Sequence, residues 1–230
     1  MDLSGVEKSK HDEKFLVKIP SAINEKLAEE TGIHIGDGSM NVYNGRFLYS
    51  LRGHRDDDCE YYTSYITSIY RELYNLDVKI RSWQDVIGFQ KASKMLVTFK
   101  RHALGMPLGE KGDIQIPYSM SNDCSFACSC LRGILDTDGC IYLENRASGL
   151  YPRIEISSTS KPLIKQISFI LNEFLKINNS CWIPRRPDGN WRTLYRVSIR
   201  GMKNMDRWFE SIGSNNPKHL RKFERITNKN

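Results

Sequence analysis

One short pattern occurs twice in this chain and constrains its fold more than any other feature. Each copy is a run of apolar and small residues that ends in Asp-Gly, at Asp37-Gly38 and again at Asp138-Gly139. Gly32 and Gly36 in the first copy, like Gly133 and Thr137 in the second, are four positions apart, which places them on one face of a helix. Such stripes let two helix backbones approach closely. The sequence therefore predicts two similar halves whose motif helices pack against each other.

The two aspartates fall in the last turn of these predicted helices. Gly38 and Gly139 follow at the position where a helix favours a left-handed residue. The C-terminal end of a helix disfavours a carboxylate by roughly 0.3–1 kcal/mol. Because pairing brings both carboxylates to one end, we expect a divalent cation with oxygen ligands to compensate them. A simple Asp-Gly turn is the alternative, and repetition behind two apolar helices argues against it.

At these residues the chain resembles the LAGLIDADG family of homing endonucleases. The second copy, Leu131 to Gly139, differs from the family signature mainly at Arg132. The first copy, Glu30 to Gly38, diverges further but keeps the next-to-last aspartate, which binds metal in that family. The resemblance extends over residues 20–225 and is to the monomeric type with two motifs.

The patterns along the chain predict an α+β fold. Asn44-Gly45 between two apolar runs is a strong hairpin signal, and Ser21 is a plausible N-cap of the first motif helix. Each half is predicted as αββαββα. Besides the motif helices, the predicted helices are 59–74, 93–104, 162–175 and 202–212. Besides the first hairpin, the predicted strands are 78–83, 88–91, 140–144, 153–158, 180–185 and 194–199. The resemblance implies tandem repeats with pseudo-two-fold symmetry, in which antiparallel sheets form a DNA-binding saddle.

The domain prediction follows from the repeat. Residues 1–14 are polar and are expected to form a flexible tail, 15–116 the first half, 117–125 a turn-rich linker and 126–230 the second half.

The bulk composition favours a polyanionic partner. Lys and Arg number 34 against 27 Asp and Glu, a net charge of +7, although many enzymes are as basic. No apolar run approaches a membrane span, and the N-terminus has no signal-peptide core. We expect an intracellular protein of the cytoplasm, nucleoid or an organelle matrix, neither secreted nor membrane-bound.

Basic and aromatic residues gather on the predicted strands, whose second face the helices leave free. Arginine reads guanine edges and phosphates, and Glu155 could read cytosine. Double-stranded DNA is the expected partner of a single chain. Because the β-strands of the two halves differ in sequence, the DNA site is expected to be long and non-palindromic. The candidate DNA contacts are Arg46, Tyr49, Arg52, Lys79, Arg81, Trp83, Arg146, Tyr151, Arg153, Glu155, Arg185, Arg186, Trp191, Arg192, Tyr195 and Arg196.

The expected chemistry centres on the two motif aspartates. Asp37 and Asp138, aided by the backbone carbonyls of Gly36 and Thr137, would bind Mg²⁺, with Mn²⁺ as a substitute and Ca²⁺ supporting binding without cleavage. A metal lowers the pKa of the attacking water and stabilises the charge of the leaving oxygen.

Two lysines occupy matching places after the motifs, Lys111 in the first half and Lys218 in the second. The resemblance implies that basic residues stabilise charge at the same phosphates; ordinary surface lysines are the alternative. Asp136 has no acidic counterpart in the first copy, where Ile35 stands, and is interpreted as structural.

Two further groups invite a metal interpretation that we consider weaker. The acidic run 56–58 beside His54 opens a predicted helix, where the dipole favours carboxylates. Cys124, Cys128 and Cys130 could hold zinc, but reduced and partly buried thiols are the expected state.

The sequence thus predicts a monomeric, site-specific DNA endonuclease that makes a metal-dependent double-strand break and needs no obligate protein partner. Intron or intein mobility is its expected context, and the sequence leaves open whether the host is an intron, an intein or a free-standing gene. The alternative is a catalytically silent relative that acts as an RNA splicing maturase or a DNA-binding regulator.

Overall fold

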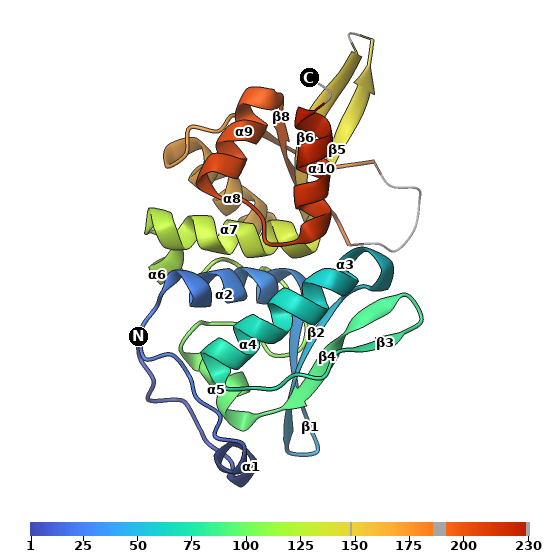
Figure 1. The fold of residues 1–230 in the computed structure, drawn as a ribbon. Coiled ribbons are helices and arrows are strands. Elements are labelled where there is room, and N and C mark those ends of the chain that lie inside the picture. Colours follow the sequence, from blue (N-terminus) through green and yellow to red (C-terminus); the bar gives the residue numbers. More distant parts are fainter. Residues whose placement is uncertain (148, 186–191, 229–230) are drawn as a thin grey trace.

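The computed structural model describes residues 1–147, 149–185 and 192–228, and it consists of two α/β halves on either side of a helix pair (Figure 1). The pair is formed by α2 (Glu25–Asp37) and α7 (Cys124–Asp138), the two motif helices. Each half adds a four-stranded antiparallel sheet with helices on one face. The predicted α+β class with two tandem repeats is confirmed.

The first half follows the predicted order closely. Its hairpin turns at Asn44 and Gly45, whose φ values of 48° and 72° are those of a type I′ turn. The strands lie in the order β1-β2-β4-β3. The elements are β1 (Gly38–Tyr43), β2 (Arg46–His54), α3 (Arg55–Tyr61), the π-helical segment η1 (Tyr62–Ile66), α4 (Thr67–Tyr74), β3 (Arg81–Trp83), β4 (Val86–Ala92) and α5 (Lys94–His102).

The second half repeats this topology with the strand order β5-β6-β8-β7. It gains a C-terminal helix, α10, that the αββαββα prediction did not include. Its elements are α6 (Tyr118–Ser121) ahead of α7, then β5 (Gly139–Arg146), β6 (Gly149–Ser158), α8 (Lys161–Glu173), β7 (Asn179–Trp182), β8 (Tyr195–Arg200), α9 (Met202–Ser211) and α10 (Pro217–Thr227).

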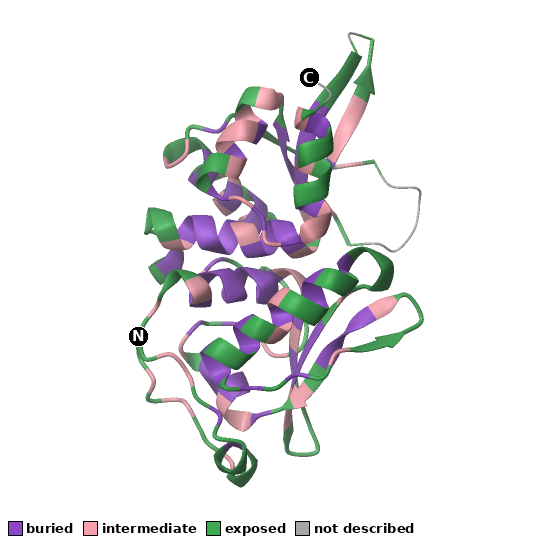
Figure 2. Cartoon of the chain, in the orientation of Figure 1, coloured by how far each residue is buried: buried purple, intermediate pink, exposed green. Residues whose placement is uncertain are grey.

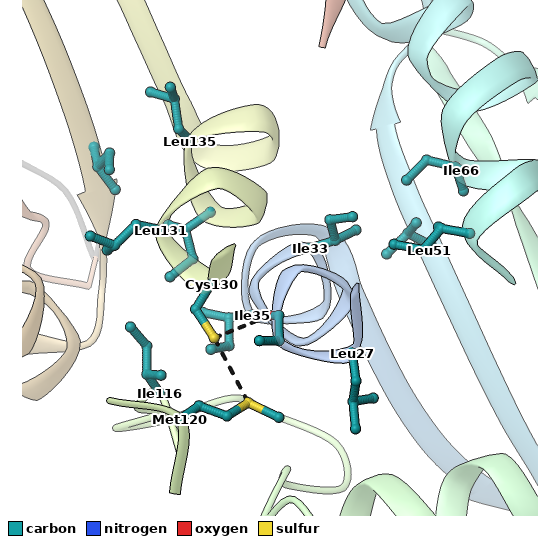
Figure 3. Close-up of a cluster of buried hydrophobic side chains, with 14 of the residues drawn as sticks. Leu27, Ile33, Ile35, Leu51, Ile66, Ile116, Met120, Cys130, Leu131 and Leu135 are labelled. Atoms are coloured by element: carbon teal, nitrogen blue, oxygen red, sulfur yellow. Dashed lines mark hydrogen bonds between the residues drawn. The ribbon is translucent and has the colours of Figure 1, made fainter. Parts of the chain in front are cut away.

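The close approach of the motif helices explains their small residues. A Cβ atom at Gly32 would lie 2.1 Å from the carbonyl oxygen of Cys130, and one at Gly133 would lie 2.2 Å from that of Glu29. Cys130 itself rests on α2, with its Sγ 3.1 Å from the carbonyl oxygen of Ala28 (Figure 3). Only glycine fits where the backbones touch, so the predicted small-residue interface is confirmed.

The helix ends differ from the prediction in two respects. Asn24, not Ser21, caps α2, and its side chain accepts a hydrogen bond from the backbone of Leu27. Gly38 and Gly139 are extended rather than left-handed, with φ of −76° and −97°. Glycine is needed there because the chain turns directly from helix into strand, and a Cβ would meet the carbonyl oxygen of His34 or Leu135.

The N-terminal segment is not the loose tail that its polarity predicted. Residues Lys10–Lys14 form α1, which begins with a capping box at Ser9. Asp12 of this helix is fully buried and accepts a hydrogen bond of 2.6 Å from Ser93, the N-cap of α5. The polar side chains here form hydrogen bonds with backbone groups and capping residues at helix ends and do not simply face solvent. Composition alone does not reveal this.

The buried residues concentrate along the helix pair and between each sheet and its helices (Figure 2). The other face of each sheet carries polar side chains, which are exposed at Arg52 and Gln90 in the first sheet and buried at Arg153 and Glu155 in the second. In the part of the chain that the structure describes, none of the helices combines the length and apolar character that a membrane span requires.

Candidate active site

Asp37 and Asp138 lie together at the shared C-terminal end of α2 and α7. A Cβ atom at Gly36 would be only 3.4 Å from the carboxyl carbon of Asp138. Asp37 is partly exposed and Asp138 exposed, so both are accessible to a ligand, although protein atoms crowd them. This desolvation and the charge of Asp138 raise the pKa of Asp37 to about 8. Desolvation also raises the pKa of Asp138, against the charges of Lys111 and Lys218.

Tyr62 orients the first of these carboxylates. Its hydroxyl donates a 2.7 Å hydrogen bond to Oδ2 of Asp37 from the first turn of η1. Asp138 accepts no comparable hydrogen bond from the residues described. The two aspartates are therefore equivalent in the backbone and different in their surroundings.

Lys111 lies directly at the end of α2. Its ammonium donates to the carbonyl oxygens of Ile35, at 2.8 Å, and of Gly36. Burial lowers the pKa of Lys111, whereas Asp138 and Asp37 raise it. A recess of about 260 Å³ opens beside it, lined in part by Asp138 and Ser158. In this structure the carbonyl of Gly36, a predicted metal ligand, is bound by the lysine.

Lys218 reaches the site from α10 but is held differently. Its ammonium forms a 2.6 Å ion pair with Oδ1 of Asp58 in α3. The same carboxylate accepts hydrogen bonds from the side chain of Asn216, at 2.9 Å, and from the backbone of His54, at 3.0 Å. Asp58 is buried, so this contact between the two halves is shielded from water.

Asp136 has the structural role that the sequence suggested. It is fully buried, accepts hydrogen bonds from the Ser214 hydroxyl and the Asn215 amide, and has a pKa raised to about 7 chiefly by burial. It fastens α7 to the segment that precedes α10.

The donors at the helix ends fit a divalent cation shared by two carboxylates. Two desolvated carboxylates close together repel each other, and a cation with oxygen ligands relieves that repulsion. Such a site would take its remaining ligands from water or a bound phosphate. Within residues 1–147, 149–185 and 192–228, no three His, Cys, Asp or Glu side chains are grouped so that they could hold a metal ion together.

The open face of the first sheet gathers predicted DNA contacts. Arg52 and Arg81 both lie opposite Gly88 of β4, and the Arg52 guanidinium lies 5.7 Å from the Trp83 ring centroid. A concavity of about 430 Å³ is formed there by Arg52, Asp77, Lys79, Arg81, Trp83, Phe89, Gln90 and Lys91. Arg46 is also exposed, at the hairpin.

The open face of the second sheet has a different electrostatic character. Glu155 forms 2.9 Å ion pairs with both Arg153 and Arg196, and Arg153 also pairs with Glu144. Arg153 and Glu155 are buried within this network. Glu155 is therefore occupied by arginines and not free to read cytosine as predicted. Arg146 is exposed and pairs with Glu144.

Two predicted DNA contacts lie on the wrong side of their sheets. Tyr49 is fully buried under the helices, beside His34 and Tyr70. Tyr195 packs against the core and against Lys161. Both errors neglect the alternation of side chains along a strand: Tyr49 is three residues from Arg46 and from Arg52, and Tyr195 is next to Arg196, so neither tyrosine can share a face with those arginines.

Arg185 and Arg192 are exposed, and Arg192 pairs with Glu110. Arg186 and Trp191 lie outside the described residues. Sequence reasoning missed Tyr62 and treated Asp58 only as a helix-opening residue. Their spacing of one helical turn places both side chains on one face of the helix, but the sequence does not show that this face lies toward Asp37 and Lys218.

Comparisons with known proteins agree with this geometry. Residues 125–213 match the model of the LAGLIDADG-like domain. A structure of I-DmoI with DNA and Ca aligns at a TM-score of 0.60 and 16% identity over 87% of this chain and 97% of that one. WhiA of Thermatoga maritima aligns at 0.55 and 16% identity, over 97% of this chain and 66% of that one.

A curated relative is longer. A glutamine–fructose-6-phosphate aminotransferase of Methanocaldococcus jannaschii is 26% identical over 217 residues, which are 93% of this chain and 18% of the relative. The chain thus spans less than a fifth of that protein. Residues 125–213 therefore match a LAGLIDADG-like domain, and the chain as a whole has the fold of I-DmoI, with its two motif helices paired.

Proposed function

We propose that this protein is a site-specific DNA endonuclease that cuts both strands of a long, non-palindromic target in a reaction that needs a divalent cation. The observation that carries the proposal is the pair Asp37 and Asp138 at the common end of α2 and α7, with Lys111 and Lys218 beside them. Two equivalent carboxylates on a pseudo-symmetry axis match the two strands of a duplex.

The substrate class follows from the open sheet faces. Arg46, Arg52, Lys79 and Arg81 line the first, and the arginine network around Glu155 lines the second. Structures of I-DmoI that share this fold were determined with DNA and Ca and with DNA and Mn, which supports DNA and a divalent ion for this chain.

In the proposed reaction, Asp37 and Asp138 would hold Mg²⁺, or Mn²⁺ in its place. When bound, the cation supplies an activated water and charge stabilisation at the leaving oxygen. Lys111, at the end of α2, is placed to stabilise charge on one phosphate, and Lys218 on the other. Tyr62 keeps the Asp37 carboxylate in one orientation.

A gene context is part of the proposal. The match to a short portion of a much longer aminotransferase supports a LAGLIDADG segment carried inside another protein, as an intein or mobile intron would encode it.

A second candidate is a DNA-binding regulator or RNA maturase that does not cleave. One observation favours it: the Lys111 ammonium already satisfies carbonyls at the end of α2 and lies near both carboxylates, as a permanent cation would in a metal-free protein.

The test is selection of bound and of cut sequences from a randomised DNA library, in EDTA, Ca²⁺ or Mg²⁺. Asp37→Asn and Asp138→Asn should abolish double-strand cleavage and leave binding in Ca²⁺ largely intact. Asp57→Asn, an exposed carboxylate of the acidic run, is the matched control and should cut normally. Tight binding by the wild type without cleavage in Mg²⁺ or Mn²⁺ would favour the second candidate.

A further inference from the structure

The stretch where α3 passes into the π-helical segment η1 approaches the site at two points. Asp58 and Tyr62 are one helical turn apart, so their side chains share a face. Tyr62 donates 2.7 Å to Asp37, and Asp58 pairs at 2.6 Å with Lys218. One short stretch of the first half thus contacts a motif aspartate of its own half and the lysine of the other.

Both side chains are tightly held. A Cβ atom at Gly53 of β2 would lie 2.7 Å from the Tyr62 ring and 3.0 Å from the Asp58 carboxylate, so this strand packs directly against both. Tyr62 is fully buried and Asp58 is 4% exposed. Buried groups that are packed and hydrogen-bonded in this way keep one rotamer and fix what they bind.

Asp58 also links the two halves. Lys218 and Asn216, which bind its carboxylate, belong to the segment around the start of α10. An ammonium on a flexible four-carbon stem is hard to place without such a partner. The carboxylate therefore determines where the Lys218 charge lies relative to Asp138.

The second half has no equivalent of this pair. Gly53 and Ser158 occupy matching places, because Leu51 pairs with Gly38 and Ile156 with Gly139. The segment that follows Ser158, residues 159–169, contains neither an acidic residue nor a tyrosine. The support is therefore one-sided.

We propose that Asp58 and Tyr62 are positioning residues for cleavage, Tyr62 acting through Asp37 and Asp58 through Lys218, and that this one-sided support makes the enzyme cut the two strands at unequal rates. The inference rests on the proposed endonuclease function and adds to it which residues create the asymmetry.

The first test is Tyr62→Phe, which removes only the hydroxyl bonded to Asp37. Its matched control is Tyr61→Phe, because the neighbouring Tyr61 is equally buried and its hydroxyl has no hydrogen-bond partner among the described residues. With each DNA strand labelled separately, Tyr62→Phe should change the ratio of the two cleavage rates about tenfold, as expected for one hydrogen bond. It should also raise the Ca²⁺ concentration that half-saturates the protein–DNA complex, whereas Tyr61→Phe should alter neither quantity.

The second test is a double-mutant cycle of Asp58→Asn with Lys218→Met. If Asp58 acts through Lys218, Asp58→Asn should slow cleavage at least fivefold alone and have no further effect when Lys218 is already replaced. Asp12→Asn, which alters another buried carboxylate far from the site, controls for lost stability, and the melting temperature is measured for every variant.

The possible outcomes distinguish the positioning roles of Asp58 and Tyr62 from the endonuclease activity itself. Equal strand rates in the wild type, equal slowing of both strands by Tyr62→Phe, or additive effects in the cycle would overturn the positioning roles while leaving the endonuclease intact. A wild type that binds DNA but cuts neither strand in Mg²⁺ or Mn²⁺ would refute the endonuclease and the unequal rates together. In that case an unchanged Ca²⁺ requirement in Tyr62→Phe would also remove the role of Tyr62 at Asp37.

Discussion

The two halves follow the same chain path but fill their cores with different chemistry. In the first half, Glu30 and Lys100 form a 2.6 Å ion pair, and both are completely buried. Leu131 precedes Asp138 at the same distance as Glu30 precedes Asp37, and Trp208 precedes Gly213 as Lys100 precedes Gly105. An ion pair on one side of the pseudo-symmetry axis thus corresponds to an apolar pair on the other.

The residues around these pairs differ in the same way. The hydroxyls of Tyr70 and Tyr74 each donate 2.6 Å to Glu30, whereas Leu171 and Leu175 occupy the corresponding places in the second half. The fold is compatible with either filling, provided that every buried polar group is satisfied. What the halves share is the small-residue face of α2 and α7, because backbone contact there admits nothing larger. The side chains of the two repeats can therefore differ in the cores of the halves, where polar and apolar residues can fill the same space, but not at the contact between α2 and α7.

The largest expected effect tests this core difference. Lys100→Met leaves Glu30 buried without a countercharge and should lower the free energy of unfolding by about 3–5 kcal/mol. Adding Glu30→Leu should recover only part of the loss, because Tyr70 and Tyr74 would then lack an acceptor, at about 1–3 kcal/mol each. Adding Tyr70→Phe and Tyr74→Phe as well should restore most of it. Urea unfolding measures all the variants.

The reciprocal change in the other half is the control. Leu131→Glu introduces a carboxylate at a fully buried position, in a half where Trp208 stands in the place of Lys100, and should destabilise at least as much as Lys100→Met. A loss below about 1 kcal/mol for Lys100→Met would mean that the Glu30 network is hydrated or neutral and that the halves differ less than their cores suggest.

The next effect sharpens the comparison at the site. Lys111 contacts the end of α2, whereas Lys218 is partly neutralised by Asp58. Both Lys→Met changes should slow cleavage by about one to three orders of magnitude. Lys111→Met should lie nearer the upper value, because among the described residues Lys111 forms no ion pair like that between Lys218 and Asp58. Single-turnover rates and DNA affinities are compared, and an affinity that falls as far as the rate would make either lysine an ordinary phosphate contact.

Local patterns predicted the fold well for a physical reason. The turn at Asn44-Gly45, the amphipathic helices and the small stripes on α2 and α7 are short-range signals that the tertiary structure reinforces. Burial of α1 and the presence of α10 were missed because they depend on partners distant in sequence, such as Ser93 for Asp12. The polar sequence of residues 1–14 was interpreted as a flexible tail, although it contains a helix whose Asp12 is buried.

The site was predicted only as far as the repeat reached. Asp37, Asp138, Lys111 and Lys218 stand in matching places and could be found by comparing the copies, and the structure brings them together. Tyr62 and Asp58 break the symmetry, so no comparison within the chain could identify them. Tyr49 was misassigned although the sequence contained the answer, because it lies three residues from Arg46 in the same strand and alternation places the two side chains on opposite faces.

Two buried histidines allow the halves to be compared by pH. Burial and the charges of Lys218 and Lys222 lower the pKa of His219 to about 3, and burial also lowers that of His34. Between the unfolded value of 6.5 and the folded one, only the unfolded chain takes up the proton, so stability falls as the pH falls, by about 1.4 kcal/mol per pH unit for each histidine.

His219→Gln, which keeps a donor for the carbonyl oxygen of Leu135, should remove one such slope from unfolding measured between pH 6.5 and 4.5. His34→Leu, which copies the Leu135 of the other half, should remove a second, independent slope. A wild type and a His219→Gln variant with parallel pH profiles would show that His219 is protonated in the folded protein.

The smallest expected effect concerns how each half meets DNA. Among the described residues, Arg52, Lys79 and Arg81 form no ion pair, and nearby Asp77 is engaged by Arg71, whereas Arg153 and Arg196 already share Glu155. Phosphate neutralisation, and hence counterion release, should come mainly from the first half.

Arg81→Ala should reduce the log–log slope of affinity against salt by about 0.9, the contribution of one phosphate contact. Arg196→Ala should change the slope by less than half as much, because the charge it removes is already compensated, although specificity on its side of the cleavage centre should relax. Lys26→Ala, at the opposite end of α2 from Asp37, is the control and should leave the slope unchanged. Equal losses of slope from Arg81→Ala and Arg196→Ala would mean that DNA binding opens the Glu155 network, and the two faces would then be electrostatically alike in the complex despite their difference in the free protein.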